Sequence, residues 1–167
     1  MESFEIHVRM LAQDLLAFKY YMFYRRYWWF VVIGLLPLFE IGGFWLMGQD
    51  IQPILGHLAL PVIFFLVLPM VMRISNQRYF NKVRAQLEQV NYRLSAEGVE
   101  IKAEGVEAKL AWHLIHSLRE TRKYYFLFRT KASANVIPKR SFVNQAKERM
   151  FLQIMQRHLS DKQYKIK

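Results

Sequence analysis

The sequence has no cysteine, and it has no lysine or arginine over one long central stretch. The absence of cysteine excludes disulfide bonds, thiol catalysis and cysteine-ligated zinc or iron–sulfur sites, and it fits a domain that faces a reducing cytoplasm. Residues 27–72 contain no Lys or Arg, although the chain of 167 residues has 24 of them against 13 Asp and Glu. The sequence is nevertheless 53% hydrophobic, so it combines two chemically different kinds of segment.

The net charge of +11 is unevenly distributed along the chain. Residues 1–26 carry +1, residues 27–72 carry −2 and residues 73–167 carry +12. This distribution excludes an intrinsically disordered chain, a disulfide-stapled secreted module and a freely soluble enzyme. It predicts four regions: a cytoplasmic strand and helix at 1–26, a two-span transmembrane hairpin at 27–73, an amphipathic juxtamembrane helix at 74–91 and a cytoplasmic domain at 92–167.

Two apolar runs predict the transmembrane hairpin. The first covers 27–47 with Glu40 as its single charge, and the second covers 54–72 with none. Twenty-one helical residues extend about 31 Å, which matches a bilayer hydrocarbon core. A cleaved signal peptide is excluded because the first run starts too late and is too long. Buried helices of a soluble protein are disfavoured because no Lys or Arg occurs over 46 residues.

The charges beside the two runs predict the orientation of the hairpin. The turn at 48–53 contains no Lys or Arg, whereas both outer flanks are basic. By the positive-inside rule, both termini face the cytoplasm, and the turn faces outward. The flanking cations are Lys19, Arg25 and Arg26 before the first run, and Arg73, Arg78, Lys82 and Arg84 after the second.

The remaining segments show strand and helix periodicities. Residues 4–10 alternate apolar and polar as a half-buried strand does, and Asp14 then caps or opens a helix. After the second run, apolar residues at 3–4 spacing predict a helix at 75–90, which either stands alone or continues the span. Whether 4–10 joins the C-terminal sheet is left open by the sequence.

Residues 92–167 predict a small α+β domain of antiparallel strands closed by one C-terminal helix. The pentapeptide Ala-Glu-Gly-Val-Glu occurs at 96–100 and again at 103–107, and each Glu-Gly pair predicts a turn. Asn144 precedes the closing helix. Strand-like segments lie at 106–112, 114–118, 123–130 and 136–138.

This region contains short motifs at 92–99, 112–115, Glu120, 124–128 and 137–142. Together they resemble the YcxB-like family of bacterial membrane proteins, which implies a bacterial inner membrane as the location. The N-terminal strand and helix before a two-span hairpin also match, so the resemblance covers nearly the whole chain. It implies a pleckstrin-homology-like domain beneath the membrane, with Trp112 and Phe142 in its core and Pro138 ending a strand. It implies no activity, catalytic residue or cofactor.

Glu40 and His57 are the polar candidates within the hairpin. Both lie in its outer half, and we expect them to meet across it. An ionisable residue at this depth is a functional hypothesis by default, here a proton or ion relay, or a latch that recognises another membrane segment. The alternative is a hydrogen bond that only pins the hairpin. We favour the alternative because a complete pathway needs more polar lining, although a homo-oligomer with several Glu40 side chains around one axis would supply it.

Basic residues form the second candidate site, a membrane or partner surface. Cations near an anionic membrane each contribute about 1 kcal/mol to binding. The positive charge therefore has two interpretations: it binds lipid headgroups or an acidic partner, or it only reflects the position of the domain close to an anionic membrane. No nucleic-acid motif accompanies the charge. Besides the cations of the second flank, the set comprises Arg119, Arg122, Lys123, Arg129, Lys131, Lys139 and Arg140.

No enzyme motif is present, which predicts a protein without catalytic residues. His113 and His116 lie three apart, and on the predicted strand they would face opposite sides and fail to chelate one metal. Three functions remain. The chain is a membrane-anchored module that binds a protein partner or anionic lipid, an immunity protein that neutralises a membrane-inserting toxin through its hairpin, or a subunit of a small oligomeric channel or transporter.

Overall fold

The computed structural model describes residues 4–50 and 52–165 and divides the chain into two compact units. Residues 1–3, Ile51 and residues 166–167 belong to the predicted N-terminal region, outer turn and C-terminal domain, and they lie outside the described residues. The first unit, here the αβ unit, comprises Met1–Phe18 and Phe80–Lys167. The second, the hairpin unit, comprises Lys19–Tyr79.

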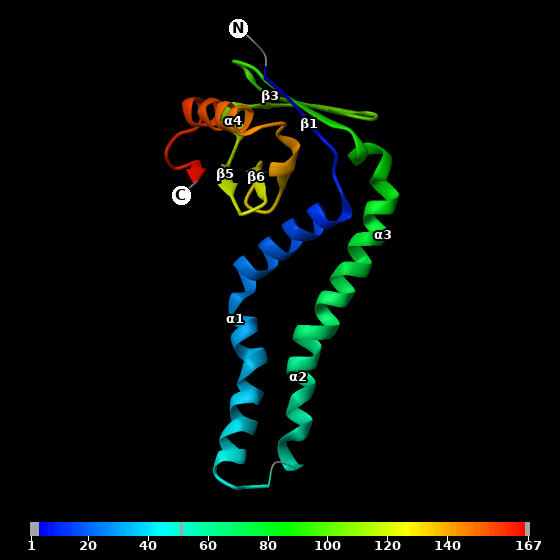
Figure 1. Ribbon diagram of the computed structural model, residues 1–167, viewed down its shortest axis with the longest axis vertical. Coiled ribbons are helices and arrows are strands. Elements are labelled where there is room, and N and C mark those ends of the chain that lie inside the picture. The colour runs from blue at the N-terminus through cyan, green and yellow to red at the C-terminus, as the bar shows by residue number, and fades with distance from the viewer. Residues whose placement is uncertain (1–3, 51, 166–167) are drawn as a thin grey trace. The chain divides into compact units, whose positions relative to one another are not determined.

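The hairpin unit consists of two helical segments that run side by side (Figure 1). Helix α1 covers Ala12–Leu46, with a non-helical residue at Tyr27, where the predicted span begins. The returning segment is helical from Gln52 to Glu88, so the predicted helix at 75–90 continues the second span. Both segments are long and apolar enough to span a membrane. The returning segment comprises η1 (Gln52–Leu58), α2 (Ala59–Val62), η2 (Ile63–Val67) and α3 (Leu68–Glu88).

Prolines account for the irregular geometry of the returning segment. Its η2 part is a π-helical turn that ends two residues before Pro69. Proline has no N–H to donate, so the carbonyl of Phe65, four residues earlier, lacks its α-helical partner. Such a gap in the hydrogen-bond ladder is a common cause of π-turns and bends in helices.

The αβ unit contains two four-stranded sheets and a C-terminal helix, α4 (Gln145–His158). The first sheet has the order β1-β2-β3-β4 and is antiparallel throughout. The second has the order β7-β6-β5-β8, in which β8 pairs parallel to β5. The strands are β1 (Phe4–Val8), β2 (Val90–Leu94), β3 (Gly98–Ala103), β4 (Val106–Ala111), β5 (Ser117–Glu120), β6 (Tyr124–Phe128), β7 (Ala134–Pro138) and β8 (Tyr164–Lys165).

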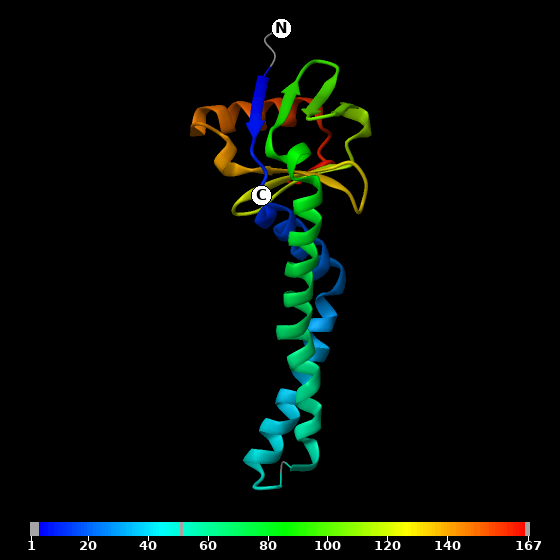
Figure 2. The ribbon, with the colours of Figure 1, turned by 90° about the vertical axis from the view of Figure 1, so that its right-hand side faces the viewer.

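The N-terminal strand β1 is part of the first sheet, which answers the question left open by the sequence. Val8, the last residue of β1, pairs with Val90, the first residue of β2, and the Met10 amide donates to the Leu87 carbonyl at 3.1 Å. Figure 2 shows β1 in blue beside the green strands of this sheet. The hairpin is therefore an insertion between two neighbouring antiparallel strands.

Strand β6 forms the centre of the core because both of its faces are covered. Tyr125 lies on one face and packs on Phe151 of α4, with ring centroids 5.4 Å apart. Phe126 and Phe128 lie on the other face and pack on Phe18 of α1, at 5.4 and 6.0 Å. Residues 125–128 are all at most 1% exposed. The Asn144 side chain caps α4 by accepting from the Lys147 amide at 2.8 Å.

Two predictions about the domain are corrected by the structure. The predicted single antiparallel sheet is two sheets, because β1 extends the first and the chain leaves it after β4. The predicted strand at 114–118 is wrong for its first half: Trp112–Leu114 forms a short 3-10 turn, η3, and β5 begins at Ser117. The Trp112 indole donates to the carbonyls of Ser95 and Ala96, at 3.1 and 3.2 Å, and this draws the chain away from an extended path.

The expected core roles of Trp112 and Phe142 are confirmed, since both are 9% exposed. Pro138 ends β7 as expected. The residues between β4 and β5 carry His113 in the 3-10 turn and His116 outside any strand. Among the residues that the structure describes, no group of three or more His, Asp or Glu side chains is arranged to hold a metal ion.

Candidate anion-binding groove

The predicted polar contact within the hairpin unit is present in the structure. Nδ1 of His57, in η1, lies 2.8 Å from Oε2 of Glu40, in α1. The side chains are 52% and 42% exposed, so the pair faces outward from the hairpin. A hydrogen bond at this distance ties the two helical segments together near the turn.

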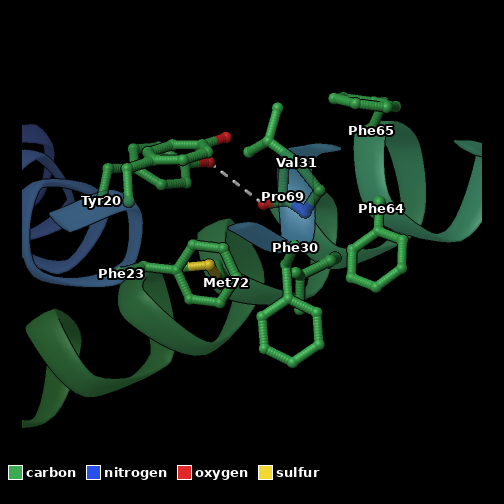
Figure 3. A pocket seen from close by; sticks show the side chains of 10 residues that line it. Tyr20, Phe23, Phe30, Val31, Phe64, Phe65, Pro69 and Met72 are labelled. Atoms are coloured by element: carbon green, nitrogen blue, oxygen red, sulfur yellow. Dashed lines mark hydrogen bonds between the residues drawn. The ribbon is translucent and has the colours of Figure 1, made fainter. Parts of the chain in front are cut away.

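The contact between the two segments farther from the turn is apolar. A small gap of about 10 Å³ separates them there, and Figure 3 shows its aromatic and aliphatic lining. One polar contact crosses it, from the Tyr20 hydroxyl to the Pro69 carbonyl at 3.3 Å. This lining offers no continuous polar path for an ion, and it therefore favours a pinning role for Glu40. The gap is lined by Tyr20, Phe23, Tyr24, Phe30, Val31, Phe64, Phe65, Leu68, Pro69 and Met72.

The predicted basic residues separate into four sets in the structure, one of which, Arg129 and Lys131, is exposed between β6 and β7. The first set, on α3, is exposed, and Arg84 lies 3.8 Å from Glu88, which also contacts Arg9 at 3.3 Å. Arg119, on β5, has a buried Nε without a hydrogen-bond partner. The third set lines an open groove of about 610 Å³ in the αβ unit. The α3 set is Arg73, Arg78, Lys82 and Arg84; the groove is lined by Gln13, Ala17, Arg122, Lys123, Tyr124, Lys139 and Arg140.

The β5–β6 turn presents two of these cations at the edge of the groove. The Thr121 amide donates to the Tyr124 carbonyl at 2.8 Å, and the Tyr124 amide donates back to the Thr121 hydroxyl at 3.2 Å. These bonds close a tight turn with Arg122 and Lys123 exposed at its tip. The Lys139 amide donates to the Lys123 carbonyl at 2.9 Å and ties the turn to the 3-10 segment η4 (Lys139–Ser141).

Arg140 is held by a carboxylate far away in the sequence. Its guanidinium donates to both Asp14 oxygens, at 2.8 and 2.5 Å, and to the Arg9 carbonyl at 3.2 Å. The Asp14 side chain is completely buried and also accepts from the Leu11 amide at 2.7 Å, which caps α1. Arg140 is thus neutralised within the unit, and the hydrogen bond to Asp14 raises its pKa.

Lys139 is neutralised by two carboxylates, those of Glu120 and Glu148. Its ammonium contacts Glu120 and lies 3.8 Å from Glu148 of α4. The Tyr125 hydroxyl donates to the same Glu148 carboxylate at 2.7 Å. Burial, followed by the hydrogen bond to Glu148, raises the pKa of Tyr125 and keeps its phenol protonated. This cluster joins the end of β7, β5 and α4 and is structural.

Arg122 and Lys123 are left as the uncompensated charges of the groove. Within the ranges that the structure describes, no carboxylate oxygen lies within 4.0 Å of either side chain. Tyr124, beside them, has its pKa raised by burial and by the nearby Asp14 carboxylate, which its hydroxyl contacts. The groove therefore presents two free cations and the neutral Gln13 side chain to a ligand.

The outer face of the first sheet contrasts with the groove because its charges cancel. Cross-strand pairs of opposite sign occupy it, including Arg93 with Glu5 at 3.6 Å and Lys109 with Glu100 at 2.8 Å. Lys102 likewise lies 3.2 Å from Glu107. Such a ladder of ion pairs stabilises the sheet. It leaves little net positive charge to attract an anionic ligand. Positive charge available for binding is thus not spread evenly over the αβ unit.

Sequence reasoning found the cations of the groove but missed its other wall. Gln13 and Ala17 come from the first turns of α1, more than 100 positions before Arg122. The sequence indicated that Asp14 caps a helix, but no local pattern links this residue to Arg140. The pairing of β1 with β2 helps to bring the start of α1 to this part of the unit.

Comparison with known proteins identifies one part of the chain. Residues 94–155 match the family model described as YcxB-like protein, which confirms the resemblance for this region. The matched range runs from the end of β2 into α4 and includes the four groove cations, but not Gln13 or Ala17. No curated protein and no solved structure matches the chain.

Proposed function

The chain carries a YcxB-like domain at residues 94–155, and from this premise we propose that it is a non-enzymatic protein of the bacterial inner membrane. The two candidate spans anchor it, and the αβ unit binds an anionic lipid or a protein partner on the cytoplasmic side. The observation that carries the proposal is the pair of cations, Arg122 and Lys123, left without carboxylate partners at the edge of an open groove.

Charge pairing elsewhere supports the groove as the binding surface. Lys139 and Arg140 are neutralised by Glu120 and Asp14, and the outer sheet face is neutralised by its own pairs. Each cation near an anionic membrane surface contributes about 1 kcal/mol to binding. Two uncompensated cations on one turn therefore supply an attraction that the paired ones do not.

The pairing of β1 with β2 supports the proposed topology. β1 precedes both candidate spans and β2 follows them, yet the two strands form one antiparallel ladder. Strands that share a ladder lie on the same side of a membrane, so the chain between them crosses an even number of times. The basic flanks and the turn without Lys or Arg then favour a cytoplasmic location for both ends.

The strand order supports a pleckstrin-homology-like architecture for the αβ unit, which we include in the proposal. Strands β1–β4 form one antiparallel sheet, β5–β7 form three antiparallel neighbours of a second, and α4 follows them. In this view, the transmembrane hairpin is an insertion between the first two strands of such a domain.

Native mass spectrometry of the tagged chain, gently extracted from its own membrane, tests the proposal. We expect either a stoichiometric second polypeptide or retained anionic lipid. Replacing Arg122 and Lys123 with Ser should abolish the retention, whereas replacing Arg129 and Lys131, exposed at the next turn, should not. A wild-type chain that emerges bare, without lipid or partner, would contradict the proposal.

The pair of Glu40 and His57 favours a second candidate function, that of an immunity protein. A polar pair that faces outward from a membrane hairpin offers hydrogen bonds to another membrane segment, such as an inserted toxin. Glu40→Gln should abolish protection in that case and leave lipid retention unchanged. A closed homo-oligomer without a partner, whose conductance is lost in the same variant, would instead support the channel or transporter subunit.

A further inference from the structure

The groove of the αβ unit has the size and the donors of a small-molecule site. Its volume of about 610 Å³ lies within the range of ligand pockets, about 300–1,000 Å³. Its lining comes from three separate elements: Gln13 from α1, Tyr124 from β6, and the two cations from the β5–β6 turn. A site assembled from several elements fixes the position of a ligand better than a single charged turn does.

The charge balance of the groove selects the chemical class of the ligand. Asp14 and Glu120 already satisfy Arg140 and Lys139, so a ligand meets two net positive charges, those of Arg122 and Lys123. A phosphate monoester carries about −1.5 to −2 at neutral pH and three acceptor oxygens. A guanidinium matches phosphate geometry with two parallel hydrogen bonds, and a lysine adds a point charge.

We propose that this groove is a binding site for a phosphate monoester group, held by Arg122 and Lys123 with Gln13 as a neutral donor. The inference rests on the proposed function and names the ligand chemistry of the same site. The phosphate belongs either to a lipid headgroup or to a soluble compound. Nine residues of chain separate Ala17, in the groove wall, from position 27, where the apolar run begins. A short tether of this kind raises the effective concentration of a headgroup.

Protection of Lys123 from chemical acetylation tests the site directly. The full chain is reconstituted in phosphatidylcholine nanodiscs, and acetylation at Lys123 is followed by mass spectrometry, with exposed Lys131 as the internal reference. One arm adds phosphatidic acid to the nanodiscs, and the other adds sodium phosphate at constant ionic strength. At about ten times the dissociation constant of the probe, acetylation of Lys123 should slow roughly tenfold, and that of Lys131 should not change.

Matched variants separate a site from general charge. Arg122→Ser should remove the protection of Lys123, whereas Arg129→Ser, which deletes the same charge from the next turn, should leave it intact. Protection by phosphatidic acid alone assigns the phosphate to a lipid headgroup. Protection by inorganic phosphate alone assigns it to a soluble compound. Protection by both probes shows that the site accepts either source. Absence of protection, or equal loss in both variants, would overturn the site. A chain that fails this test but still retains lipid or a partner after extraction keeps the proposed function and loses only the phosphate site.

Discussion

Asp14 and Arg140 form an ion pair whose two ends differ in their access to water. The Asp14 side chain is completely buried, whereas that of Arg140 is 42% exposed. Removing the arginine leaves a carboxylate inside the protein, without a counter-charge, beside the Leu11 amide and the Tyr124 hydroxyl. Removing the carboxylate leaves a guanidinium that water can still reach. The energetic cost of losing this pair therefore depends on which partner is removed.

The first prediction follows from that asymmetry. Arg140→Met should destabilise the αβ unit by about 2–4 kcal/mol, somewhat less than for a fully buried pair, because part of the interaction is solvent-screened. Asp14→Asn should cost about 1–2 kcal/mol, since the amide oxygen still caps α1. Pulse proteolysis in urea, with the chain in detergent micelles, measures both. Arg149→Met, at an exposed position of α4, is the control, and equal losses in the two pair variants would contradict the argument.

A second prediction concerns pH and the outer face of the first sheet. A hydrogen bond from Lys109 holds the pKa of Glu100 below its ordinary value, against a smaller opposing effect of burial. A lowered folded-state pKa contributes stability above the ordinary glutamate pKa, and this contribution is lost as pH falls through the folded value. Lys109→Met should raise the pKa of Glu100 in a carboxyl NMR titration. Lys102→Met removes a weaker electrostatic effect on Glu100 and should raise the pKa of Glu100 less. If the pKa of Glu100 is unchanged in both variants, the pairing with Lys109 is refuted.

At the scale of elements, the same dipeptide has two different structural roles. Glu-Gly occurs twice, and the sequence predicted a positive-φ turn at each. Gly105 has φ +69° in the β3–β4 turn, as expected, with no atom within 4 Å of an added Cβ. Gly98 begins β3, and a Cβ there would overlap the Leu110 carbonyl oxygen and lie 2.9 Å from the Ala111 Cα. One glycine is required by backbone conformation, and the other by the close approach of a neighbouring strand.

The third prediction compares these glycines. Gly105→Ala should cost about 1–2 kcal/mol, the price of a left-handed conformation for a residue with a Cβ. Gly98→Ala should cost more, because β4 itself must move. Hydrogen exchange of the β3 and β4 amides separates the two outcomes: faster exchange along both strands is expected for Gly98→Ala, and faster exchange at the turn alone for Gly105→Ala. A larger loss of stability for Gly105→Ala than for Gly98→Ala would contradict the prediction, because it would show that β4 moves at little cost to admit the added Cβ.

Sequence patterns predicted the helices and strands better than they predicted which other elements each one packs against. The aromatic run 124–128 predicted a strand, and the 3–4 spacing after the second span predicted a helix at 75–90, because such periodicities are local. Nothing local shows that β6 is covered on both faces, by Phe18 from one end of the chain and Phe151 from the other. The 3-10 turn at Trp112 was missed for the same reason, since its hydrogen bonds go to Ser95 and Ala96.

For the candidate site, the sequence identified the cations but not their charge balance. Arg122 and Lys123 differ from Lys139 and Arg140 only in the carboxylates beside them, and Asp14 lies 126 positions from Arg140. Such distant pairs follow from strand pairing, which one sequence does not encode in any short pattern. The contact between Glu40 and His57 was predictable, because a short turn between two helices limits which residues can meet.

At the scale of the whole molecule, one folded unit is interrupted by another. The αβ unit is completed by β1, whose sequence neighbours are the membrane-spanning candidates and not the rest of the domain. This arrangement constrains topology more strongly than charge bias does, since a strand pair cannot form across a bilayer.

The fourth prediction tests that topology and uses the absence of cysteine. Gln49→Cys in the turn between the candidate spans should react with a membrane-impermeant maleimide added to spheroplasts. Lys162→Cys, after α4, should react only once the membrane is permeabilised. The natural chain serves as the unlabelled control because it has no cysteine. Labelling of both variants in intact spheroplasts would contradict an even number of crossings with cytoplasmic ends.

The pairing of β1 with β2 also sets an order of events during synthesis. β2 follows β1 by 82 positions, which a ribosome needs about 4–16 s to translate. Throughout that interval, β1 has no partner strand while both candidate spans are synthesised. The first sheet is completed only after the second of them has emerged. A chain stalled before that step displays an open strand edge to proteases and chaperones.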